Sequence, residues 1–321
     1  MTATVPTDRG RVARRPARGV AGTAGLLTPG VLLLVVCAVL PLIAIVVSGF
    51  ARDTGGFTTA NFSRALGSPT YVSLLLRTLL TAVAVTVLSI ALGWPAAWAL
   101  ARYVRPRTRS LVLGLVVIPY ITSQLLLMYG FMTLIQAGGP LSALLTLFGA
   151  DPQASFLYTP AATLVMLVYE SIPTAVLVMY SASERVDPAL LEAARTLGAG
   201  RLRTFGTVIW PLSSGMLLVN FSLTFVQTVG AFAEPQVLGG PDGGLLGTAI
   251  SEQLNTGSGQ SFAIALSLLL LVVSLAVVGV VALLLRIGSG RRRARPATAV
   301  TAVAAATVSP SLDTALLEGR R

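Results

Sequence analysis

The sequence predicts an all-α membrane protein with six transmembrane helices and both termini in the cytoplasm. Of its 321 residues, 54% are hydrophobic and 11% are charged, whereas an average soluble domain has about 25% charged residues. The hydrophobic residues form six long runs, and most basic residues fall in alternate gaps between these runs. Composition and pattern together indicate a polytopic membrane protein rather than a soluble one.

Each apolar run has roughly the 20 residues that cross a hydrocarbon core about 30 Å thick. Each must be helical, because lipid offers no hydrogen-bonding partner to a loose backbone amide. The first run is too long for the core of a signal peptide and has no clear cleavage site, so we expect it to remain as a membrane helix. The expected helices span residues 26–50, 71–101, 111–136, 159–182, 211–232 and 262–285.

Arginine decides the expected orientation. It supplies all 23 basic residues and gives the chain a formal net charge of +11. Most arginines lie in residues 1–25, 101–110, 183–210 and 286–295. The positive-inside rule therefore places both termini and the 183–210 loop in the cytoplasm. Because the arginines lie between apolar runs and not on one soluble face, we expect no nucleic-acid partner.

The two ends of the chain have the composition of disordered segments. Residues 1–25 mix arginine with Pro, Gly, Thr and Ala, and are expected to form a disordered basic arm. Residues 287–321 combine an arginine cluster with Ala/Thr/Val low complexity, and are expected to form a disordered tail. The chain has no histidine and one cysteine, Cys37, within an apolar run. We therefore expect no metal site and no disulfide framework.

The chain is organised around the charged loop at residues 183–210. Asp187 has the character of a helix N-cap, and Pro188 suits the first helical position, where a missing N–H costs nothing. Gly198 is placed to end this short helix in a left-handed conformation. The expected apolar face of the helix consists of Leu190, Leu191, Ala194 and Leu197. A second short segment is expected to follow before Pro211 opens the next membrane run.

This loop resembles the cytoplasmic "EAA" loop of the permease subunits of ATP-binding-cassette (ABC) importers. The matching residues are Glu192, Ala193, Ala194, Gly198, Ile209, Pro211 and Leu212, and Arg195 and Arg201 lie in the same loop. The resemblance covers about residues 71–286 and implies the type I ABC importer permease fold. It also implies that the loop is the coupling helix that docks on an ATPase subunit. By its local chemistry alone, the loop also fits an amphipathic turn at the membrane interface.

Three further motifs resemble the permeases for spermidine and putrescine. They are Leu157-Tyr158-Thr159-Pro160, Tyr169 with Pro173, and Leu238-Gly239-Gly240-Pro241. Ferric-iron permeases share parts of these motifs, so a permease for ferric iron or another small solute is the alternative. The resemblance implies a subunit of a binding-protein-dependent polyamine importer in the bacterial cell membrane.

The same resemblance implies the partners. They are two ATPase subunits, a second permease subunit or a second copy of this chain, and an extracytoplasmic substrate-binding protein. The chain has no phosphate-binding loop of the G-x-x-x-x-G-K-S/T kind. We therefore expect ATP and magnesium to bind at the ATPase subunit, with no cofactor on this chain. The chain is expected to be a transport subunit and not an enzyme.

Glu170 lies in the middle of an otherwise uncharged run. A charged side chain at that depth costs about 2.5–3.5 kcal/mol on insertion scales and normally faces a cavity or a partner. A carboxylate on the pathway would attract a polycation, and aromatic rings could add cation–π contacts. The candidate pathway residues are Glu170, Tyr169, Tyr120, Gln124, Gln227 and Phe232.

A structural role for Glu170 is the alternative. Glu170 could pair with Arg77, or it could form a buried hydrogen bond to Gln124 or Gln227. The two hypotheses are equally compatible with the sequence.

The other membrane-flanking residues are given peripheral roles. Glu234 and Asp242 are expected to face the binding protein or solvent. Trp94, Trp98 and Trp210 are expected to anchor helix ends at the membrane interface.

Two other classes of membrane protein fit the sequence less well. A secondary transporter would use inverted repeats with broken helices, and residues 26–136 and 159–285 show no convincing repeat. A membrane enzyme would need a catalytic constellation, and the sequence has no histidine and no paired carboxylates within its apolar runs.

Overall fold

The computed structural model describes residues 19–50, 56–147, 149, 155–256 and 259–293. Within this part of the chain the first helices are α1 (Gly19–Gly49), α2 (Ala60–Gly67), α3 (Pro69–Tyr103), α4 (Pro106–Ile121), α5 (Gln124–Ile135), α6 (Pro140–Thr146) and α7 (Pro160–Glu184). They are followed by α8 (Pro188–Thr196), α9 (Arg201–Thr204), the π-helical turn η1 (Phe205–Ile209), α10 (Trp210–Val229), α11 (Ala233–Leu238), α12 (Leu246–Asn255) and α13 (Gln260–Arg293).

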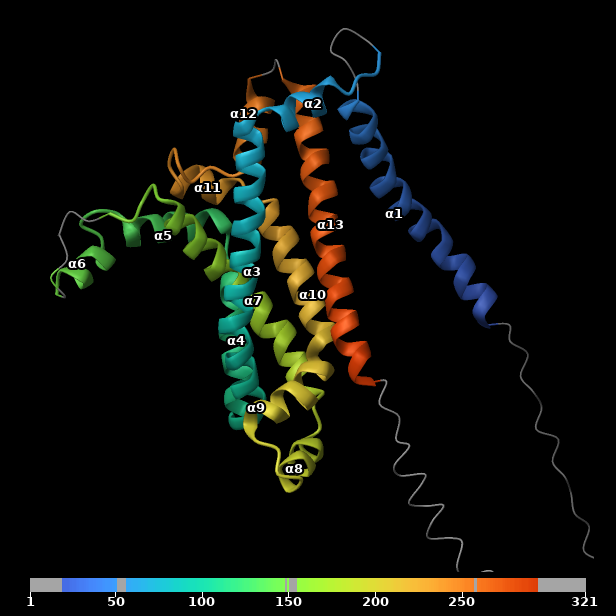
Figure 1. Ribbon diagram of the computed structural model, residues 1–321, viewed down its shortest axis with the longest axis vertical. Coiled ribbons are helices and arrows are strands. Elements are labelled where there is room, and N and C mark those ends of the chain that lie inside the picture. The colour runs from blue at the N-terminus through green and yellow to red at the C-terminus, as the bar shows by residue number, and fades with distance from the viewer. Residues whose placement is uncertain (1–18, 51–55, 148, 150–154, 257–258, 294–321) are drawn as a thin grey trace, which may run out of the picture.

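Six segments of the described chain are long and apolar enough to cross a membrane, as predicted. They are Leu32–Gly49, Pro69–Tyr103, Gln124–Thr146, Pro160–Glu184, Arg201–Val229 and Gln260–Ile287. The longest helices stand side by side in a bundle, whereas α5 and α6 extend sideways from it and α8 lies beyond one of its ends (Figure 1). The N-terminal end of α1 and the C-terminal end of α13 point toward the same end of the bundle as α8 (Figure 1).

The core of the bundle consists of α3, α7 and α10, which all pack against one another. Met166 and Met179 of α7 and Phe225 of α10 are among its fully buried side chains. α13 packs on α10, and α1 packs on α13. α1 diverges from α13 along its length (Figure 1), and its large hydrophobic side chains from Leu32 to Val47 are exposed.

Two predicted boundaries of disorder are wrong. α1 begins at Gly19, inside the expected basic arm, and α13 continues to Arg293, inside the expected tail. Hydropathy marks the part of a helix that lipid can cover, whereas each residue added to an existing helix still gains a backbone hydrogen bond. The rest of the expected arm and tail, residues 1–18 and 294–321, lies outside the described residues.

The expected single helix over residues 111–136 is two helices. α4 begins earlier, with Pro106 at its first position, and ends at Ile121. Thr122 and Ser123 have extended backbones, and α5 begins after them. Pro119, in the last turn of α4, has no N–H to donate, so the helix is already weakened where it stops. The break lies beside the candidate pathway residues Tyr120 and Gln124.

The loop between α11 and α12 is packed against the start of α7. Gly240 has a φ of +60°, and a Cβ there would lie 2.7 Å from the carbonyl oxygen of Tyr158. Tyr158 itself has a φ of +64°, which is uncommon for a residue other than glycine. Two of the sequence motifs shared with polyamine permeases therefore meet in the fold, and their contact requires glycine at position 240.

Candidate functional site

A polar cavity of about 420 Å³ lies between α5, α7, α10 and α11. It is lined by Gln124, Leu125, Leu167, Glu170, Ser171, Gln227, Thr228, Gly230, Ala231, Phe232, Ala233 and Glu234. We call it the acid-lined cavity. A smaller cavity of about 150 Å³ adjoins it and shares Gln124, Glu170 and Gln227 with it. Pro119, Tyr120, Thr122 and Leu127 complete the smaller lining.

Two carboxyl groups meet in the acid-lined cavity. Glu170, on α7, is partly buried, and it lines the same cavity as Glu234. Glu234, in the first turn of α11, is 2% exposed. The side-chain amide of Gln124 donates to Oε1 of Glu234. Oε1 of Glu170 is buried and has no hydrogen-bond partner within the described residues.

Most of the predicted pathway residues come together here. Gln124, Glu170, Gln227 and Phe232 line the acid-lined cavity, and Tyr120 lines the smaller one. Tyr169 lines neither. It lies next to Glu170 on α7, and the 100° step between successive helical residues turns it to another face.

The structure corrects two expectations about acids. Glu234 faces neither solvent nor an external partner but is buried against Gln124 and Glu170. Arg77 donates to the backbone carbonyl of Asp242, so the alternative Glu170–Arg77 pair is not formed. In the sequence, Glu234 is visible only as an acid close behind an apolar run; the structure adds that it lies in the first turn of a helix, where an acid is favourable.

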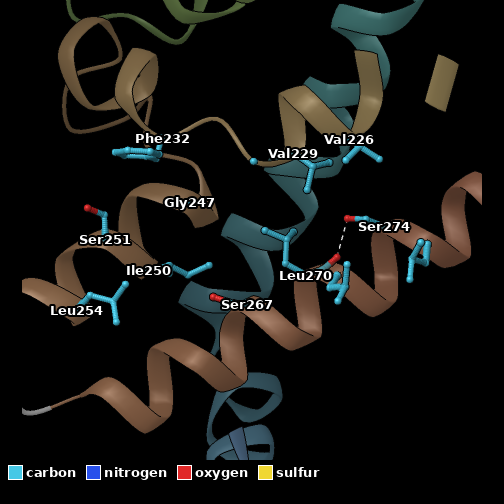
Figure 2. Close-up of a pocket in the computed structure, with 13 residues that line it drawn as sticks. Val226, Val229, Phe232, Gly247, Ile250, Ser251, Leu254, Ser267, Leu270 and Ser274 are labelled. Carbon is cyan, nitrogen blue, oxygen red and sulfur yellow. Dashed lines mark hydrogen bonds between the residues drawn. The ribbon is translucent and has the colours of Figure 1, made fainter. Parts of the chain in front are cut away.

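A second pocket of about 490 Å³ lies between α10, α12 and α13 (Figure 2). We call it the apolar pocket, because its walls are mainly aliphatic, with Val226, Val229, Ile250, Leu254, Leu270, Leu271 and Leu275 among them. Two of its serine hydroxyls donate within α13: Ser267 to Ala263 at 2.9 Å and Ser274 to Leu270 at 2.6 Å. The described lining contains no charged side chain.

The loop carrying α8 has the predicted capping residues. Oδ1 of Asp187 accepts from the backbone N–H of Ala189 at 2.9 Å. Gly198 has a φ of +75°, and the N–H groups of Gly198 and Ala199 donate to carbonyls in the last turn of α8 at 2.9 Å each. These two hydrogen bonds together form the Schellman motif. The backbone is thus fixed at both ends of α8.

The surface of this loop is exposed and partly apolar. Of the predicted coupling residues, Glu192, Ala193, Arg195, Gly198 and Arg201 are exposed, and Ala194 and Pro211 are partly buried. Leu197 is 86% exposed and Leu202 is 89% exposed. Both leucines belong to the short segment that carries the predicted coupling residues.

The second short segment expected before Pro211 consists of α9 and η1, and α10 begins one residue before Pro211. α9, η1 and α10 follow without a gap. Pro211 falls in the first turn of α10, where its missing N–H is accommodated by the wider π-helical turn that precedes it.

Trp94 does not anchor a helix end at the membrane interface, as was expected. It is 9% exposed, and its ring lies 5.1 Å from that of Phe205 and 6.0 Å from that of Trp210. These rings join α3 to the start of α10. Trp94 is buried because two segments that are distant in the sequence pack together. The hydrophobic periodicity of one segment cannot predict such a contact.

Comparisons with known proteins agree with this architecture. Residues 89–286 match the family described as "Binding-protein-dependent transport system inner membrane component". The spermidine/putrescine transport system permease protein PotB of Escherichia coli (strain K12) is 34% identical over 228 residues, which are 69% of this chain and 82% of PotB. The molybdenum transport system permease protein ModB of Azotobacter vinelandii is 34% identical over 157 residues, which are 48% of this chain and 67% of ModB.

A solved structure has the same fold. A bacterial ABC transporter involved in the import of the acidic polysaccharide alginate aligns with 83% of this chain and 95% of its own chain, with a TM-score of 0.66 and 18% identity. The predicted ABC importer permease fold is therefore confirmed.

Proposed function

Because the chain belongs to the family of binding-protein-dependent transport system inner membrane components, we propose that it carries spermidine or putrescine across the membrane through the acid-lined cavity. Family membership makes it a multi-pass permease subunit of an ABC importer, which works with an ATPase and a substrate-binding protein. The polyamine substrate is supported by the similarity to PotB. The observation that carries the proposal is the meeting of Glu170 and Glu234 in one cavity.

The chemistry of this cavity suits an ammonium group. Two acids that share a buried cavity ionise together most readily when a cation lies between them, because the cation turns their mutual repulsion into attraction. Gln227 and Gln124 add side-chain carbonyl oxygens that can accept from an N–H donor. The rings of Phe232 and Tyr120, on the walls of the two adjoining cavities, can add cation–π contacts. Glu170 would thus have a pathway role rather than a purely structural one.

We further propose that α8 docks on the ATPase subunit. Support comes from its place beyond the end of the bundle (Figure 1) and from the exposed leucines of its loop. With α8 docked in this way, the loop and both termini would lie in the cytoplasm, in agreement with the expectation from the arginine distribution. The complete importer would contain two ATPase subunits, a second permease or second copy of this chain, and an extracytoplasmic binding protein. ATP and magnesium would bind at the ATPase subunits.

Another small solute is the alternative substrate, because ModB belongs to a molybdenum transport system and is also similar to this chain. The test is ATP-dependent uptake of radiolabelled spermidine into proteoliposomes that contain the complete importer. Unlabelled putrescine, molybdate and ferric citrate serve as competitors. We expect spermidine uptake that putrescine inhibits and the other two do not. No uptake of spermidine, or uptake that molybdate or ferric citrate inhibits and putrescine does not, would contradict the polyamine assignment.

A further inference from the structure

Arg102 joins the end of α3 to the start of the loop that carries α8. Its Nη2 donates to the carbonyl oxygen of Ser183 at 3.1 Å and to that of Val186. Its guanidinium also lies over the ring of Trp98, 4.9 Å from the ring centroid. Ser183 and Val186 are completely buried. Arg102 therefore satisfies carbonyls left open at the end of α7 and holds the backbone directly before Asp187, the N-cap of α8.

Arg109 makes a second connection one turn into α4. Its Nη1 lies 3.3 Å from Oε1 of Glu184, the last residue of α7. The hydroxyl of Tyr180 donates to the same oxygen, and the Arg109 guanidinium lies 5.8 Å from the centroid of the Tyr180 ring. The first turn of α4 is thus tied to the last turn of α7, four residues before α8 begins.

The other end of α4 reaches the candidate pathway. Pro119 and Tyr120, in its last turn, line the smaller cavity together with Glu170. α4 has 16 residues, so it spans about 24 Å at 1.5 Å per residue. One helix therefore runs from the base of the α8 loop to the wall that contains the acidic side chain.

We propose that Arg102 and Arg109 are positioning residues for coupling. They fix the base of α8 to α3 and α4, so that a displacement of α8 by the ATPase moves the cavity wall through α4. The proposal rests on the docking of α8 on the ATPase, and neither arginine touches the substrate in this scheme. The side chains of Arg109 and Glu184 are 26% and 48% exposed. An ion pair this exposed contributes little to folding, so its loss should separate coupling from stability.

The test uses the complete importer in nanodiscs and measures how strongly the binding protein, as purified, stimulates ATP hydrolysis. Arg109→Glu places like charges together. We expect unchanged assembly and basal hydrolysis, with stimulation reduced by about fivefold or more, the lower end of usual coupling effects. Adding Glu184→Arg to this variant reverses the pair and should restore stimulation to within about twofold of the parent. Arg102→Lys keeps the charge but loses the planar fork, and should also reduce stimulation.

Arg107→Glu is the matched control. Arg107 is exposed on the same helix and forms no ion pair within the described part of the chain, so the same charge change should leave stimulation intact. Three results would overturn the proposal: parent-like stimulation in Arg109→Glu, no recovery in the reversed pair, or an equal loss in Arg107→Glu. The readout does not depend on which solute is carried. An importer that is stimulated but carries no polyamine would contradict only the proposed substrate.

Discussion

The acid-lined cavity and the apolar pocket have similar volumes, about 420 and 490 Å³, and lie on either side of the same segment of chain. Gly230 and Phe232 line both. The acid-lined cavity contains two carboxyl groups and two glutamine amides, whereas the apolar pocket has serines as its polar side chains (Figure 2). The two cavities therefore cannot be told apart as cation sites by their volumes. They differ in their acceptor groups, which matter because burying an ammonium group without acceptors is costly.

Of the changes considered for the two cavities, removal of both acids should lower spermidine uptake most. We expect Glu170→Gln combined with Glu234→Gln to lower ATP-dependent spermidine uptake by about 100-fold. Each hydrogen bond to a charged group contributes on the order of 1.5–3 kcal/mol, and 1.36 kcal/mol is about tenfold in rate. Assembly should persist, because an amide is close in shape to a carboxylate and cheaper to bury. Initial uptake rates and detergent-extracted complex yields measure the two effects.

The control for this prediction is Glu252→Gln, which removes one exposed acid from α12. It should leave uptake unchanged. If the double variant assembles and transports spermidine like the parent, the acid-lined cavity is no more a cation pathway than the apolar pocket is.

Phe232→Ala acts on the boundary between the two cavities and should have an intermediate effect. Cation–π contacts contribute about 0.5–2 kcal/mol, so we expect uptake to fall by about 2- to 30-fold. A Phe232→Tyr variant keeps the ring and should stay close to the parent. Equal uptake by all three proteins would show that the shared wall takes no part in transport.

The smallest effect is expected within the apolar pocket itself. Ser267→Leu should fill part of its volume and change spermidine uptake by less than about twofold, because well-accommodated apolar additions cost little when space is available. A thermal-shift measurement should find stability equal to or above that of the parent. A tenfold loss of uptake with normal stability would instead make the apolar pocket part of the pathway.

Local chemistry predicted the backbone of the loop that carries α8 well. The cap at Asp187 and the left-handed Gly198 depend on residues within a few positions of each other, and both were confirmed. The sequence also singled out Glu170, which lines the acid-lined cavity, because a lone acid stands out in an apolar run. The sequence did not place Glu234 or Trp94 correctly. Their burial depends on contacts with Gln124 and Phe205, each about 110 positions away, and single-chain periodicity contains no information about such contacts.

The α4–α5 break was missed for a different reason. Two moderately polar residues, Thr122 and Ser123, lower the hydropathy too little to interrupt a long apolar run. The backbone nevertheless leaves the helical conformation at these two residues. Pro119 alone was compatible with a kinked continuous helix, since membrane helices tolerate proline.

The contact between Gly240 and Tyr158 constrains which changes this gene can accept. Neither side of the contact has room for another atom near the glycine Cα, and both residues have positive φ. An insertion or deletion in the α11–α12 loop would change the register of the glycine relative to the start of α7. Such a change, or any substitution that adds a Cβ at position 240, is therefore expected to break the contact between the two motifs.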